Sequence, residues 1–185
     1  MQGGTVALAP YEFYTTEELL HAYSTGPLRL AQVLTGLTEG EIRSRVRGPE
    51  KWSIQEIVMH VADSEIQGAF RIRKAWAEPG TKSPCYDQDK WTRELGHQHA
   101  ETSARGLSLE LFALLRQTTL PIFTRARKAD WEHVIIHPEF GSISLRNLLE
   151  LYADHSERHI AQILDMREKL GKPLRFPLLL PRRLY

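Results

Sequence analysis

Cysteine is nearly missing from this sequence, since Cys85 is the only one among 185 residues. A single cysteine cannot form a disulfide within the chain, and such low usage is typical of a reducing compartment. Residues 1–10 also lack the basic and apolar regions of a signal peptide. We therefore expect a cytoplasmic protein.

Long apolar runs and a surplus of charge are absent too. No hydrophobic stretch approaches the ~20 residues that span a bilayer, so we expect no membrane partner. The 24 Lys and Arg balance the 23 Asp and Glu, which gives a formal net charge of +1. Nucleic-acid-binding proteins usually carry a basic surplus, so no nucleic-acid partner is expected.

Several catalytic signatures are also missing. The chain has no glycine-rich phosphate loop, no serine nucleophile elbow, and no zinc-protease helix that pairs two histidines around a neighbouring glutamate. It does have eight histidines, more than a chain of this length usually contains. These histidines are the first candidates for a functional site.

Hydrophobic spacing and capping signals predict a helical protein. Gly26 and Pro27 interrupt the first helical region, so we expect that helix to be broken in two. Ser53 and Glu56 form a capping box at the start of the second region, and Ser144 is expected to cap the last. The four expected helical regions are residues 15–37, 53–77, 108–128 and 144–170.

The segments between these regions have their own signals. Residues 134–144 have strand character around a turn at 138–141, which predicts a small hairpin or extended loop before the last helix. Residues 81–96 read as a structured loop with one helical turn. We expect one all-α four-helix-bundle domain over residues 1–185, with an irregular lead-in at 1–12 and an extended tail at 172–185.

The strongest local signal for chemistry is the pair His155 and His159. Four residues advance about 400° around a helix, so both rings leave the same face one turn apart. Two imidazoles in this arrangement are a common way to hold a borderline metal ion. The alternative is an ordinary pair of surface histidines.

His60 is the expected third ligand. It lies in the second long helix, and a metal site inside a bundle takes its ligands from facing helices. Three imidazoles would leave one coordination position open, which is the pattern of a catalytic rather than a structural site. The alternative is a histidine satisfied within a polar core, with no metal.

Other groups are expected around these ligands. Asp63 follows His60 by three residues, on nearly the same helical face, and Tyr152 and Gln162 flank the histidine pair at helical spacing. Each could equally be an ordinary contact. Glu157, two residues beyond His155, is expected to point to the opposite side and to be solvated.

Taken together, these motifs resemble the DinB superfamily, and within it the YfiT-like branch. The resemblance rests on Lys51-Trp52-Ser53-Ile54, on the run from His60 to Ser64, on Tyr86-Asp87 with Trp91, and on the pair His155 and His159. It spans roughly residues 13–170.

The resemblance implies a DinB-type bundle, a homodimer, and one zinc or nickel ion per chain on His60, His155 and His159. It also places Tyr86 and Trp91 in the pocket wall. The branch is described as metal-dependent hydrolases and, for some members, bacillithiol S-transferases.

We therefore expect a metal-dependent enzyme acting on a small molecule, either a thiol S-transferase or a hydrolase. The alternative is a bundle that binds metal or ligand without catalysis.

Overall fold

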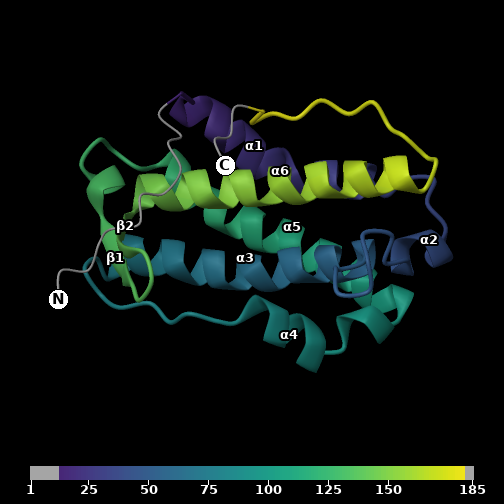
Figure 1. The fold of residues 1–185 in the computed structure, drawn as a ribbon. Coiled ribbons are helices and arrows are strands. Elements are labelled where there is room, and N and C mark those ends of the chain that lie inside the picture. The colour runs from purple at the N-terminus through teal and green to yellow at the C-terminus, as the bar shows by residue number, and fades with distance from the viewer. Residues whose placement is uncertain (1–12, 182–185) are drawn as a thin grey trace.

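The computed structural model describes residues 13–181 as a helical protein with one small hairpin (Figure 1). The long helices are α1 (Thr16–Gln32), α3 (Ile54–Ala77), α5 (Thr102–Thr124) and α6 (Leu145–Lys169). The short elements are α2 (Glu39–Arg43), α4 (Gln88–Glu94), the 3-10 turns η1 (His97–His99) and η2 (Asp130–Glu132), and the antiparallel strands β1 (Val134–His137) and β2 (Gly141–Ser144). The predicted all-α bundle with a hairpin before the last helix is confirmed. The expected lead-in, residues 1–12, and residues 182–185 lie outside the described residues.

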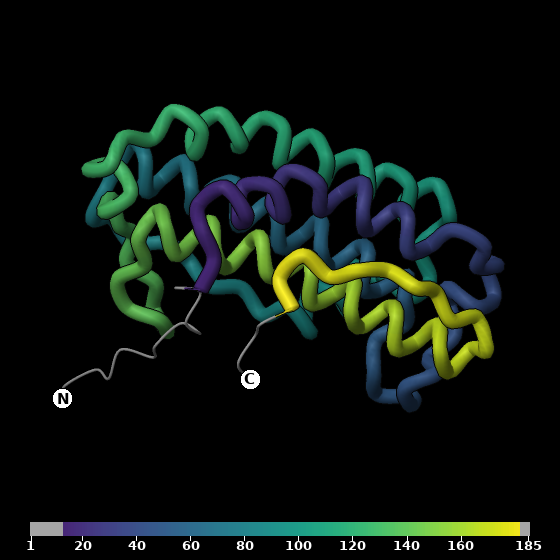
Figure 2. The backbone as a smooth tube through the Cα atoms, turned by 90° about the horizontal axis from the view of Figure 1, so that it is seen from above, coloured from purple at the N-terminus to yellow at the C-terminus, as the bar shows by residue number. Residues whose placement is uncertain are grey.

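The four long helices pack in a ring, in which α1 and α3 each contact both α5 and α6 (Figures 1 and 2). Their apolar side chains form two clusters along the bundle, one around Phe123 near the hairpin and one around Phe112 at the other end. Ile57 and Val61 belong to the second cluster, so the helical turn that carries His60 enters the core there. No helix within residues 13–181 combines the length and the apolarity that crossing a membrane requires.

Helix α1 runs unbroken through Gly26 and Pro27, so the predicted break was wrong. Proline has no N–H to donate to the carbonyl four residues earlier, which here is that of Tyr23. The guanidinium of Arg116 donates to this carbonyl instead, at 2.7 Å. A side chain at position 26 would lie only 2.4 Å from Arg116 Nη1, so glycine gives the guanidinium room to reach the helix.

Helix starts follow the capping signals where the sequence supplies them. Ser53 Oγ accepts the amide of Glu56, whose carboxylate accepts the amide of Ser53 at 2.8 Å, as the capping box predicts. Ser144 caps α6 in the same way. Helix α5 starts at Thr102 rather than near residue 108, and its N-cap residue makes no side-chain capping bond. The sequence therefore carried no capping signal for that start.

The C-terminal segment, residues 172–181, contains no helix or strand and runs back over α1 and α6 (yellow in Figure 1). Arg29 donates to the carbonyl of Pro177 at 2.7 Å, and Glu157 accepts the amide of Leu179 at 2.6 Å. Glu157 is fully buried and pairs with Arg29 at 2.8 Å, so its predicted solvation was wrong. The tail covers the face of α6 that would otherwise meet water.

Candidate metal site

Three imidazole rings converge between α3 and α6. Nε2 of His155 lies 3.2 Å from Nε2 of His60 and 3.2 Å from Nε2 of His159. Metal–nitrogen bonds of 2.0–2.1 Å in a tetrahedral site would separate two ligand nitrogens by about 3.3 Å. The rings are therefore spaced as ligands of one ion, and three imidazoles are a donor set that suits zinc or nickel.

The protonation of the imidazole rings is also compatible with a bound cation. Nδ1 of His159 lies 3.0 Å from Oε1 of Gln162, and because an amide oxygen only accepts, the ring proton is on Nδ1. Nε2 of His159 then turns a lone pair toward His155. Nε2 of His155 can form an N–H···N hydrogen bond in only one of its two close contacts. A cation would instead accept the lone pairs of all three Nε2 atoms.

Burial keeps these rings neutral. Burial away from water, and to a lesser extent the electrostatic effect of His159, lowers the pKa of His60 to about 2. Loss of solvent also lowers the pKa of His159, to about 4, and it lowers the pKa of His155, with smaller effects from His159 and His60. Neutral imidazole is the form that binds a metal.

These shifts predict how the metal-free protein responds to acid. Unfolded histidine has a pKa near 6.5, so below that pH these histidines become protonated in the unfolded chain. In the folded chain the three rings stay neutral, because their pKa values are lower. The free energy of unfolding should therefore fall between pH 6.5 and pH 5, by up to about 1.4 kcal/mol per pH unit for each such ring. Urea unfolding of chelator-treated protein at both pH values measures it. A chain with His155 and His159 both changed to alanine should show a flatter profile, and an equal slope would contradict the assignment.

An aromatic wall stands beside the rings. Trp52 lies with its ring centre 4.6 Å from that of His60 and 6.5 Å from that of His159. From the sequence, Trp52 was noted only as part of the family resemblance, and its contact with the histidines was missed. This tryptophan precedes α3 on irregular backbone, where no spacing rule predicts the direction of a side chain.

A cavity of about 720 Å³ opens at the ring of His159, and its lining also includes Trp52 and Gln162. This volume falls within the range of small-molecule sites. Its rim carries charges of both signs, among them Arg47, Lys51 and Asp89. The candidate centre is thus buried on the side of His60 and open on the side of His159.

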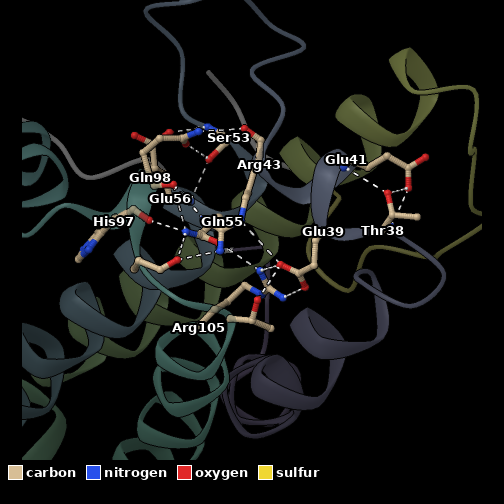
Figure 3. Close-up of polar contacts among 12 residues, drawn as sticks. Thr38, Glu39, Glu41, Arg43, Ser53, Gln55, Glu56, His97, Gln98 and Arg105 are labelled. Carbon is tan, nitrogen blue, oxygen red and sulfur yellow. Dashed lines mark hydrogen bonds and ion pairs between the residues drawn. The ribbon is translucent and has the colours of Figure 1, made fainter.

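One wall of this cavity is the turn η1, which is fastened to the first turn of α3 (Figure 3). The buried amide of Gln55 donates to the carbonyls of His97 at 2.7 Å and Ala100 at 3.0 Å, and accepts from Arg105 at 3.1 Å. Ser53 Oγ donates to the side chain of Gln98 at 2.7 Å. This polar cluster holds the wall against the helix that carries His60.

Asp63 was expected to support His60, but it contacts another histidine. Its Oδ2 lies 2.7 Å from Nε2 of His97, which is buried. His97 was given no role from the sequence because it lies in a loop-like stretch that fixes no geometry. Asp63 and His97 instead join η1 to α3.

Of the other side chains expected near the site, one contacts a candidate ligand and three lie elsewhere. Gln162 contacts His159, as the helical spacing indicated. Tyr86 packs on Trp91 with ring centres 4.7 Å apart, and Tyr152 accepts a hydrogen bond from Arg71 at 2.9 Å. Within residues 13–181, the lining of the large cavity includes Gln162 but none of these three aromatic side chains.

Removing the amide of Gln162 tests its role. A Gln162→Met chain should bind metal about 10–100-fold more weakly, because the ring of His159 loses the contact that orients it. Competition against a chelator of known affinity measures the change. Gln162→Glu keeps an acceptor at that position and should retain most of the affinity. Equal loss in both variants would show that the amide oxygen does not matter.

Comparisons with known proteins identify the family of this chain. The family model described as DinB superfamily matches residues 22–163. A Bacillus mycoides protein named as a candidate metal-dependent hydrolase is 29% identical over 147 residues, which cover 78% of this chain and 81% of that protein. A Bacillus licheniformis protein with a similar name is 31% identical over 121 residues, covering 65% and 67% respectively.

Two solved structures share the fold. YfiT from Bacillus subtilis, described as a metal-dependent hydrolase candidate with an unusual four-helix bundle topology, superposes with a TM-score of 0.79, 22% identity, and coverage of 89% of this chain and 94% of that one. A mycothiol-dependent maleylpyruvate isomerase superposes with a TM-score of 0.56 and 14% identity, covering 84% and 63%. The matched family, the histidine geometry and the shared bundle lead to one conclusion: the chain belongs to the DinB superfamily.

Proposed function

We propose that this chain is a metal-dependent enzyme that acts on a small molecule, with His60, His155 and His159 as the metal ligands. The observation that carries the proposal is the convergence of three imidazoles, with Nε2 of His155 3.2 Å from Nε2 of both other rings, beside a cavity of about 720 Å³. Three protein ligands with an open side are the usual arrangement of catalytic zinc sites. Relatives named as metal-dependent hydrolase candidates support the same class.

A divalent ion held by these rings would supply Lewis-acid activation of a thiol or a water nucleophile. The side chains of the chain do the remaining work. Gln162 orients the ring of His159, and Trp52 excludes water from one side of His60 and His159. The open side toward the cavity admits the nucleophile and the small molecule that it attacks.

Within this class we place transfer to a low-molecular-weight thiol of the bacillithiol type first, and hydrolysis second. The cavity is large enough to hold a thiol and an electrophile together. A protein of the same fold is described as mycothiol-dependent, which supports a thiol cosubstrate. The hydrolase names of the relatives support water as the nucleophile.

One pair of assays separates the two reactions. Metal-loaded protein is given a model electrophile with and without added thiol, and then ester and amide substrates with no thiol. Thiol-dependent conjugation that His159→Ala abolishes would establish the transferase. Metal-dependent hydrolysis without thiol would establish the hydrolase. If the metal-loaded protein does neither, the enzyme proposal fails and a non-catalytic metal- or ligand-binding bundle takes its place.

We further propose zinc or nickel as the ion, one per three-histidine centre, in a cytoplasmic homodimer. Large apolar side chains remain exposed on adjacent helices, which supports a partner surface: Ile66 and Phe70 on α3, and Leu107, Leu111 and Leu114 on α5. Light scattering tests the dimer. A monomer at all practical concentrations would remove it.

A further inference from the structure

A second group of metal-binding residue types lies apart from the three histidines. Sγ of Cys85 is 3.6 Å from Nε2 of His137, and a carboxylate oxygen of Glu139 completes a set whose ligand atoms all lie within 4.8 Å of one another. These residues share a cavity of about 340 Å³ with Arg71 and Tyr86. This cluster has no residue in common with the first centre.

Backbone hydrogen bonds bring the two parts of this cluster together. The amide of Ser83 donates to the carbonyl of Ile136 at 2.9 Å, and the amide of Ile136 donates to the carbonyl of Thr81 at 2.9 Å. The segment before Cys85 thus pairs with strand β1, which ends at His137. Because both segments are held by main-chain contacts, the distance between sulfur and imidazole does not depend on flexible side chains alone.

We propose that Cys85, His137 and Glu139 form a second metal site, suited to zinc. Thiolate, imidazole and carboxylate are all zinc ligands. A tetrahedral zinc ion with a sulfur at about 2.3 Å and a nitrogen at about 2.0–2.1 Å would hold those two atoms about 3.6 Å apart. The observed distance of 3.6 Å between Sγ and Nε2 matches that value. Glu139 lies on an exposed turn, so its carboxylate is free to close on the ion.

Metal binding at this cluster must move the ring proton of His137 and remove the thiol proton of Cys85. The amides of Glu139 and Phe140 approach Nδ1 of His137 at 3.2 and 3.4 Å, so in the metal-free chain the ring proton is on Nε2. Binding through Nε2 moves this proton to Nδ1, and the two amides then turn to water. The thiol of Cys85 loses its proton to solvent, so one proton is released for each ion bound at neutral pH.

The charges around the cluster permit a cation. Arg71 contributes one positive charge, and its guanidinium is already occupied by contacts to Ser83, Tyr152 and Pro84. Asp87 and Glu139 line the same cavity, and with the deprotonated Cys85 they more than offset that charge.

A reactive thiol is the rival explanation, and the surroundings of Cys85 disfavour it. Loss of solvent, and then the carboxylate of Glu139, raise the pKa of this thiol. Nucleophilic and redox-sensing cysteines have a lowered pKa, because the thiolate is the reactive form. Cys85 therefore keeps its proton at neutral pH until a cation displaces it.

Cobalt spectroscopy tests the second site directly, and the test does not depend on the enzyme proposal. A thiolate bound to Co²⁺ gives a near-ultraviolet sulfur-to-metal charge-transfer band, and Cys85 is the only cysteine in the chain. Titration of the reduced full-length protein with Co²⁺ should give this band, and zinc should displace it. The band should vanish in Cys85→Ser and need at least tenfold more cobalt in His137→Gln. It should persist in His155→Ala, which weakens only the three-histidine centre.

Three results would overturn the proposal. Absence of the band from the unmodified protein would show that Cys85 does not bind the ion. An unchanged titration in His137→Gln would reduce the site to a solvent-exposed thiol. Loss of the band in His155→Ala would mean that the sulfur serves the first centre. Circular dichroism of each variant checks that a lost band does not come from a lost fold.

Discussion

Replacing His155 with alanine is expected to abolish stoichiometric metal binding at the three-histidine centre. His155 is the central member of the proposed ligand set, because its Nε2 lies 3.2 Å from the corresponding atom of both other rings. Without it only two imidazoles remain, and they come from different helices. The thermal stabilisation that metal gives the native chain should disappear with binding, because an ion stabilises only the state that binds it.

The measurement is metal content and melting temperature with and without added ion. It is best made in a Cys85→Ser chain, so that the proposed second site contributes nothing. His21→Ala is the matched control, because His21 is exposed on α1 and far in sequence from the candidate ligands. If His155→Ala keeps one ion per chain and the same metal-dependent shift in melting temperature, the assigned ligands are wrong.

Replacing Arg116 with alanine should lower the free energy of unfolding by about 3–5 kcal/mol, the usual cost of breaking a buried ion pair. Arg116 and Glu65 are almost fully buried, and Nε of Arg116 donates to the carboxylate at 3.0 Å. The same guanidinium donates to the carbonyls of Tyr23 and Tyr152. Its loss leaves a buried carboxylate without a cation, and it leaves the carbonyl of Tyr23, to which Pro27 has no N–H to donate, without a donor.

Urea unfolding of the metal-free protein measures this loss. The double variant Arg116→Met, Glu65→Leu removes both charges and fills the space, so it should be less destabilised than Arg116→Ala alone. A loss below about 1 kcal/mol in Arg116→Ala would show that the pair contributes no more than a surface salt bridge. The hydrogen bond from Arg116 to the carbonyl of Tyr23 would then not be what allows Pro27 inside helix α1.

Local rules were enough to predict much of the fold and the three histidines that the structure brings together. Helical periodicity and capping placed α3 and α6, because the signals of Ser53 and Ser144 act within one turn. The spacing of His155 and His159 put both rings on one helical face for the same reason. The convergence with His60 followed from the expectation that a bundle brings facing helices together.

Three of the failures involve partners distant in sequence. Pro27 stays within a continuous helix because Arg116, on α5, donates to the carbonyl that proline leaves free. Glu157 is buried because the C-terminal tail and Arg29 cover it. Asp63 turns to His97 because η1 folds onto α3. No spacing rule along one helix contains such information.

X-ray absorption at the metal edge of a loaded Cys85→Ser chain tests the central claim most directly. The expected result is three imidazole nitrogens at about 2.0–2.1 Å with one or more exchangeable oxygen ligands. A first shell built from fewer imidazoles, or a closed shell of protein ligands with no exchangeable position, would contradict an open three-histidine centre.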